Sequence, residues 1–148
     1  MKKIKDPSIA TEKYDHRMNF KEPVSYNKWV EYIENNKDYF VWTEDTEKGK
    51  KISANIDQIS EVIREGVLRT LNKRQACAEY NERKGYHEVL VTYIDKFGKI
   101  STTFMKRINR KHLQILLDMA TYLDALLLNN GRQIINQDII DLKYPPKS

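Results

Sequence analysis

The chain has 148 residues, 40% of them hydrophobic, with five glycines and four prolines, a composition that excludes low-complexity, collagen-like and disordered proteins. This length suits one domain with its own core, so we expect a single domain over residues 1–148. The formal net charge is +5, and residues 96–112 contain six Lys or Arg and no acid, so the excess positive charge lies in one segment.

The N-terminal part of the sequence predicts an arm, a short helix and a strand. Residues 1–24 contain two prolines and show no periodicity, so we expect an irregular arm there. Ser25 is a favourable helix N-cap, and apolar residues that include Trp29 follow it at helical spacing, which predicts a helix of about three turns. The aromatic and β-branched residues within 38–43 then predict a strand.

The clearest amphipathic pattern predicts a long helix over residues 56–84. Asn55 stands three residues before Gln58, which is the spacing of a capping box. Gly85 tolerates the left-handed conformation that ends many helices, and Gly66 inside the segment suggests a close contact with another helix. One face of this predicted helix is lined by Ile56, Ile59, Ile63 and Val67.

The C-terminal half predicts a β-hairpin followed by a second long helix. Alternating β-formers on both sides of an Asp-Lys-Phe-Gly turn predict a hairpin over residues 87–107. Asn109 can cap a helix over residues 110–130, and Asn136 can cap a short helix before a tail at residues 144–148. The order helix, strand, helix, hairpin, helix therefore predicts an α+β fold, with a small, mainly antiparallel sheet and helices on one face.

Positive charge concentrates where the predicted hairpin leads into the last helix. Cations in the first turn of a helix cost about 0.3–1 kcal/mol each at low salt, because the helix dipole is positive there. The same dipole and the free backbone N–H groups attract anions, so the cations predict a phosphate or carboxylate site, with a merely solvated corner as the alternative interpretation. The candidate binding residues are Lys96, Lys99, Lys106, Arg107, Arg110, Lys111 and His112.

Arg107 and His112 are separated by four residues, and this R-x4-H spacing resembles the catalytic motif of HEPN-type ribonucleases. The resemblance implies that the pair handles phosphate charge and proton transfer during RNA cleavage. It covers six residues of the chain. That family is all-helical and usually has a polar residue after its Arg, whereas Ile108 follows here and a predicted strand precedes the motif.

Other common sites are not indicated. The three histidines are scattered among unrelated elements and no Cys/His/Asp spacing suits zinc or iron, so we expect no metal or cofactor. Cys77 is the only cysteine, so no disulfide can form within the chain, and we expect it to be a small buried residue of the long helix. No apolar run has the length of a signal peptide or of the ~20-residue membrane span, which predicts a cytoplasmic protein without membrane contact.

These observations predict a non-catalytic, cytoplasmic interaction protein whose basic hairpin–helix corner binds the acidic surface of a partner protein. An immunity-protein or antitoxin-like setting would suit such a domain. A nucleic-acid-binding module is the alternative, because phosphates and acidic protein surfaces attract the same side chains. A HEPN-like ribonuclease that uses Arg107 and His112 is the third hypothesis.

Overall fold

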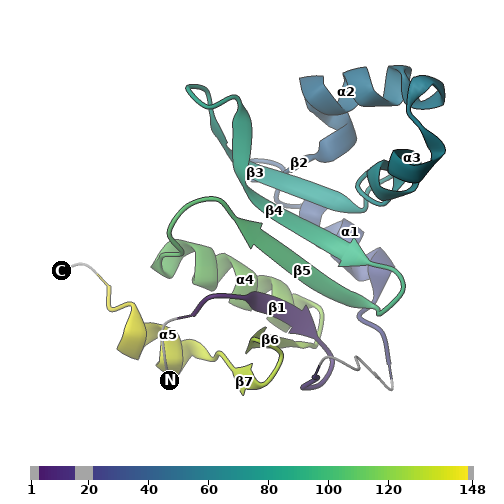
Figure 1. The fold of residues 1–148 in the computed structure, drawn as a ribbon. Helices are drawn as coiled ribbons and strands as arrows, with labels where there is room; N and C mark the ends of the chain where they lie inside the picture. Colours follow the sequence, from purple (N-terminus) through teal and green to yellow (C-terminus); the bar gives the residue numbers. More distant parts are fainter. Residues whose placement is uncertain (1–3, 16–21, 147–148) are drawn as a thin grey trace.

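The computed structural model describes residues 4–15 and 22–146. Within them, seven strands form one antiparallel sheet in the order β2-β3-β4-β5-β1-β6-β7, and five α-helices accompany it, so the predicted α+β class is confirmed (Figure 1). The strands are β1 (Pro7–Ala10), β2 (Val41–Trp42), β3 (Gln75–Asn81), β4 (Tyr86–Ile94), β5 (Lys99–Phe104), β6 (Leu126–Asn129) and β7 (Gln133–Ile134). The helices are α1 (Tyr26–Glu34), α2 (Glu47–Ala54), α3 (Glu61–Leu68), α4 (Arg110–Tyr122) and α5 (Gln137–Lys143), with 3-10 turns η1 (Thr43–Asp45) and η2 (Ile56–Gln58).

The predicted hairpin is confirmed as β4 and β5, paired from Val89 opposite Phe104 to Ile94 opposite Lys99. Gly98 closes the turn with a φ of +65°, the left-handed conformation expected of a glycine there. A side chain at this position would also collide with Pro23, because an ideal Cβ would lie 2.3 Å from the proline Cβ. The local turn signal was therefore sufficient to predict this element.

Helices α1 and α4 pack on one face of the sheet and contribute much of the core. Trp29 of α1 and Leu113 of α4 are fully buried, and they belong to the same hydrophobic cluster as Val91 of β4 and Ile100 of β5. The three predicted N-caps are present. The Ser25 side chain accepts a hydrogen bond from the Lys28 N–H. The Asn109 side chain accepts one from the His112 N–H, and the Asn136 side chain accepts one from the Ile139 N–H.

The predicted helix over residues 56–84 is wrong. Asn55 makes no side-chain cap hydrogen bond, and the segment contains only the short turn η2 and the two-turn helix α3 before the chain turns at residues 69–74. Asn72 and Lys73 both adopt positive φ angles, which ends helical geometry. Strand β3 follows and hydrogen-bonds to β2 on one side and β4 on the other, so tertiary pairing overrides the helix propensity of its alanines.

The predicted helix over residues 110–130 is too long. Helix α4 ends at Tyr122, Asp124 has a φ of +52°, and β6 then pairs with β1 and β7. Leu127 and Leu128 are both almost completely buried although they point to opposite faces of the sheet. An uninterrupted apolar run suits a doubly covered strand as well as a helix, which explains the error.

The predicted irregular arm over residues 1–24 contains a strand in its described part, while residues 1–3 and 16–21 lie outside the described residues. Strand β1 lies between β5 and β6 in the sheet, and its Ile9 is fully buried. A four-residue strand is too short to show periodicity in the sequence. The predicted strand over residues 38–43 is only the two-residue β2, and in the predicted tail Tyr144 is half-buried while residues 147–148 lie outside the described residues.

Candidate functional site

The start of α4 is held by a reciprocal pair of hydrogen bonds between Asn109 and His112. The Asn109 Oδ1 accepts from the His112 backbone N–H at 3.0 Å, and the His112 Nδ1 accepts from the Asn109 backbone N–H at 3.1 Å. This is a capping box in which histidine replaces the usual Glu or Gln. The cap at Asn109 was predicted, whereas the acceptor role of the His112 ring was not.

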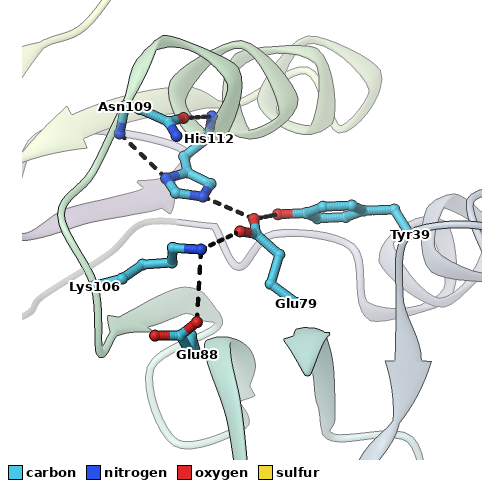
Figure 2. Close-up of polar contacts among 6 residues, drawn as sticks. All are labelled: Tyr39, Glu79, Glu88, Lys106, Asn109 and His112. Carbon is cyan, nitrogen blue, oxygen red and sulfur yellow. Dashed lines mark hydrogen bonds and ion pairs between the residues drawn. The ribbon is translucent and has the colours of Figure 1, made fainter. Parts of the chain in front are cut away.

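The other nitrogen of His112 connects α4 to β3. His112 Nε2 lies 2.7 Å from the Glu79 Oε2, and the Tyr39 hydroxyl donates a hydrogen bond to the same oxygen (Figure 2). The Lys106 Nζ lies 2.9 Å from the Glu79 Oε1 and 3.6 Å from the Glu88 Oε1. We call these residues the Glu79 cluster: Tyr39, Glu79, Glu88, Lys106, Asn109 and His112.

Glu79 occupies an unusual position for a strand residue. Its φ is +57°, in the left-handed region that non-glycine residues seldom adopt. Its neighbours on β3 keep regular pairing with β4, because Ala78 lies opposite Val89 and Tyr80 lies opposite His87. The local rotation lets a carboxylate in the middle of a strand reach the start of α4 (Figure 2).

The pKa values in the Glu79 cluster describe an ionised carboxylate beside a neutral histidine. Burial alone would raise the pKa of Glu79, but hydrogen bonds from Tyr39 and Lys106 and the contact with His112 lower it to about 2. Burial lowers the pKa of His112 below its usual 6.5. Because Nδ1 accepts a backbone N–H, the single proton of the neutral ring lies on Nε2 and points at Glu79.

This arrangement gives His112 a structural role. Its side chain is only 1% exposed, and both ring nitrogens are already engaged, so neither can exchange a proton with a substrate without breaking the capping box or the Glu79 contact. Arg107 is exposed and makes no hydrogen bond or ion pair with His112 among the described residues. Among the described residues, no contact therefore joins the two members of the R-x4-H motif.

The seven predicted binding residues lie at two ends of the hairpin. Lys96 and Lys99 are at the β4–β5 turn, where the Lys96 Nζ lies 5.4 Å from the centre of the Phe97 ring. Lys99 is buried, and its Nζ lies 4.6 Å from the centre of the Tyr14 ring. The other five follow the opposite end of β5, so the run of cations in the sequence does not form one continuous patch.

Two cations at the α4 end are neutralised within the fold. Lys106 pairs with Glu79 and Glu88, as described above, and the Arg110 guanidinium lies 2.7 Å from the Asp141 carboxylate of α5. Arg110 also donates a hydrogen bond to the Tyr144 carbonyl. The two Arg110 contacts explain how this cation is tolerated at the positive end of the α4 dipole, because an acid and a carbonyl lie beside it.

Arg107 and Lys111 remain exposed and take part in no ion pair within residues 4–15 and 22–146. The Lys111 Nζ lies 5.4 Å from the centre of the Tyr39 ring, a cation–π contact. Arg107 instead lines a shallow groove of about 610 Å³ between the β5–α4 connection and the end of α5. The groove residues are Arg107, Ile108, Asn109, Lys143 and Tyr144.

The groove adds two residues that sequence reasoning missed. Lys143 is exposed, and Tyr144 is half-buried with a hydroxyl that has no hydrogen-bond partner in the part of the chain that the structure describes. They lie more than 30 residues after Arg107 and reach it because α5 docks on α4, through the buried Ile140 and the Arg110–Asp141 pair. No local sequence pattern predicted that the end of α5 would lie beside Arg107. The N-cap signal at Asn136 did predict α5 itself.

Metal binding, membrane spans and similarity to known proteins give no further indication of a site. The described residues contain no group of three or more His, Cys, Asp or Glu arranged to hold a metal ion. None of the helices in residues 4–15 and 22–146 is both long and apolar enough to cross a membrane. Comparisons with protein-family models, curated proteins and solved structures found no match.

Proposed function

We propose that this chain is a non-catalytic, cytoplasmic interaction protein that binds the acidic surface of a partner protein through the groove between Arg107 and Lys143. The observation that carries the proposal is the composition of that groove. The exposed cations Arg107 and Lys143 line the groove, and Ile108 and Tyr144 form the apolar part of its wall. Arginine and tyrosine are enriched at protein interfaces, and a guanidinium can bind a carboxylate with two hydrogen bonds.

The surroundings of the groove favour a protein over a nucleic acid. Nucleic-acid interfaces are much more positively charged than protein interfaces. At this corner, Lys106 and Arg110 are already paired with Glu79, Glu88 and Asp141. Phosphates would therefore meet acids as well as cations, whereas a partner that presents both carboxylates and apolar side chains would match this mixed surface.

A non-catalytic role is supported by the state of the titratable groups. Glu79 already accepts three donors, and both nitrogens of His112 are occupied. The His112 ring has no unengaged nitrogen, and three of the about four acceptor positions of the Glu79 carboxylate are occupied, so acid–base chemistry at His112 would have to break an existing contact. In the immunity-protein or antitoxin-like setting, the partner would be a toxin or effector whose acidic surface this groove covers.

Fluorescence anisotropy with three labelled probes tests the proposal. The probes are a peptide of alternating glutamate and leucine, a short RNA and a short duplex DNA, each titrated over a salt series. We expect the peptide to bind, and we expect Arg107→Glu and Lys143→Glu each to weaken its binding by about tenfold, as loss of one interfacial charge contact does. The double variant Lys50→Glu with Lys51→Glu changes two exposed cations of α2 and should leave binding unchanged.

Two results would contradict the proposal. RNA or DNA binding that falls steeply with salt and is lost in the Arg107 and Lys143 variants would replace the protein partner with a nucleic acid. Peptide binding that the α2 variant weakens as much as the groove variants do would show a nonspecific attraction to net positive charge.

A further inference from the structure

Helix α3 presents apolar side chains to solvent on its outer side. Val62 is 91% exposed and Ile63 is 60% exposed, and no residue of α3 is buried. Gly66 lies one helical turn after these two residues, and a Cβ built there would have no atom within 4 Å. The close helix contact predicted for Gly66 is thus not made by any described residue of the same chain.

The opposite side of α3 contacts the turn that precedes the helix. The Arg64 guanidinium donates hydrogen bonds to the carbonyl oxygens of Ile56, Asp57 and Ile59 at 3.0–3.1 Å. Val67, three residues after Arg64, is half-buried. Because Arg64 and Val67 point away from them, Val62, Ile63 and Gly66 form an outward surface of α3, which we call the α3 patch.

The charged residues beside the α3 patch, one acid and one base, can pair with the same two residues of a second copy. Glu65 and Arg69 form an ion pair at 3.0 Å along one edge of the helix, and both side chains are more than 70% exposed. When two identical helices pair antiparallel about a twofold axis, the same edge of each helix meets that of its partner. Glu65 of one copy then lies beside Arg69 of the other, and the reverse contact forms by symmetry.

We propose that the α3 patch is a docking site for a second copy of this chain, as an antiparallel, twofold-symmetric pair of α3 helices that cross near Gly66. A glycine at the crossing allows the two backbones to approach closely, while Val62 and Ile63 pack on either side. Figure 1 shows α2 and α3 together beyond the β2 side of the sheet, away from α4 and α5. The groove beside Arg107 therefore stays open in the pair, and this inference does not depend on the proposed function.

The contact is small for a protein dimer. One two-turn helix from each copy buries less than the roughly 800 Å² per partner of a standard interface. We therefore expect a weak, concentration-dependent dimer, with a dissociation constant between about 1 µM and 1 mM.

Sedimentation equilibrium of the purified full chain over that concentration range tests the dimer. The wild-type chain should shift from monomer to dimer, and Val62→Asp should raise the dissociation constant at least about tenfold, because it places a carboxylate in the α3 patch. Val62 is so exposed that the fold of the monomer, checked by circular dichroism, should be unaffected. Leu142→Asp, which changes another exposed apolar residue on α5, is the matched control and should dimerise like the wild type.

A charge exchange then tests the antiparallel geometry. Glu65→Lys and Arg69→Glu should each weaken the dimer about tenfold, because each leaves like charges facing across the twofold axis. The double variant should recover to within about threefold of the wild type, because every contact regains one acid and one base.

Three results would overturn the inference. The first is a wild-type chain that stays monomeric up to about 1 mM. The second is a dimer that Val62→Asp does not weaken. The third is a double charge variant that dimerises no better than the two single variants.

Discussion

At the scale of single residues, Glu79 is the most constrained group in the candidate site. A non-glycine residue held in the left-handed region costs of order 1–3 kcal/mol, and Glu79 has a φ of +57°. Three donors converge on its carboxylate, from Tyr39, Lys106 and His112. These charge-assisted hydrogen bonds offset the backbone strain and join the turn after α1, strand β3 and the start of α4 (Figure 2).

Replacing Glu79 by Gln should destabilise the protein. The amide keeps the shape of the side chain but removes the charge that Lys106 contacts, and it cannot accept all three donors, so we expect a loss of about 1.5–3 kcal/mol. Urea denaturation measures the free energy of unfolding directly. Glu82→Gln, at an exposed position in the β3–β4 turn, is the control and should change it by less than about 0.5 kcal/mol. Equal losses in the two variants would mean that the Glu79 cluster contributes nothing specific.

Stability should also fall in acid because of Glu79. Its pKa in the folded chain is about 2, against an ordinary 4.5, so the carboxylate stabilises the fold fully above pH 4.5. This contribution, roughly 3 kcal/mol, is lost as the pH falls from about 4.5 to about 2. The measurement is the difference in free energy of unfolding between the wild type and Glu79→Gln as a function of pH. The difference should shrink across this window, and a constant difference would contradict the assigned pKa.

His112 adds a second, milder pH dependence. Burial holds its pKa below the usual 6.5, so the unfolded chain takes up this proton more readily than the folded chain. Protonation would also place an N–H on Nδ1, opposite the Asn109 N–H that Nδ1 now accepts. Stability should therefore begin to fall as the pH drops below about 6.5.

At the scale of elements, local signals were enough to predict some segments and insufficient for others. The caps at Ser25, Asn109 and Asn136 and the β4–β5 hairpin depend on neighbouring residues, and all are present. Strands β1 and β6 depend on partners far away in the chain, whereas β3 pairs with the adjacent β4 and was missed because its alanines favour a helix. Ile9, for example, pairs with Ile100 and Leu127, about 90 or more residues away, and nothing in its own neighbourhood reveals them.

In the candidate site too, features that depend on neighbouring residues could be predicted, and contacts with distant residues could not. The cations around α4 and the cap at Asn109 were visible in the sequence. Their acidic partners were not, because Glu79 contacts His112 across 33 positions and Asp141 reaches Arg110 from the following helix. Lys143 and Tyr144 were missed for the same reason. Counting the cations along the sequence therefore overestimated the number of them that are free to bind a partner.

The caps offer a direct comparison between a true and a false signal. Asn109→Ala should lower stability by about 1 kcal/mol, because its side chain accepts the His112 N–H at the start of α4. Asn55→Ala should change it by less than about 0.5 kcal/mol, since Asn55 makes no side-chain N-cap hydrogen bond and donates only one exposed side-chain hydrogen bond, to the Lys51 carbonyl. Thermal unfolding of both variants beside the wild type measures this. A larger loss at Asn55 than at Asn109 would contradict the assignment of the caps.

At the scale of the whole molecule, the sheet separates two candidate contact surfaces. Helices α1 and α4 cover one face, and the groove opens where α4 and α5 meet the end of β5. The α3 patch lies with α2 beyond the β2 side of the sheet (Figure 1). Because the surfaces are separate, a dimer through α3 would carry two grooves, and binding at each could be tested without disturbing the other.

The central claim is that the groove beside Arg107 binds acidic protein segments, and mapping by NMR tests it most directly. Backbone amide shifts of the labelled chain would be followed while the glutamate–leucine peptide is added. We predict that the shifts concentrate at Arg107, Ile108 and Asn109 and at Lys143 and Tyr144, with little change at the lysines of α2. Shifts centred elsewhere, or spread evenly over all exposed lysines, would contradict the account.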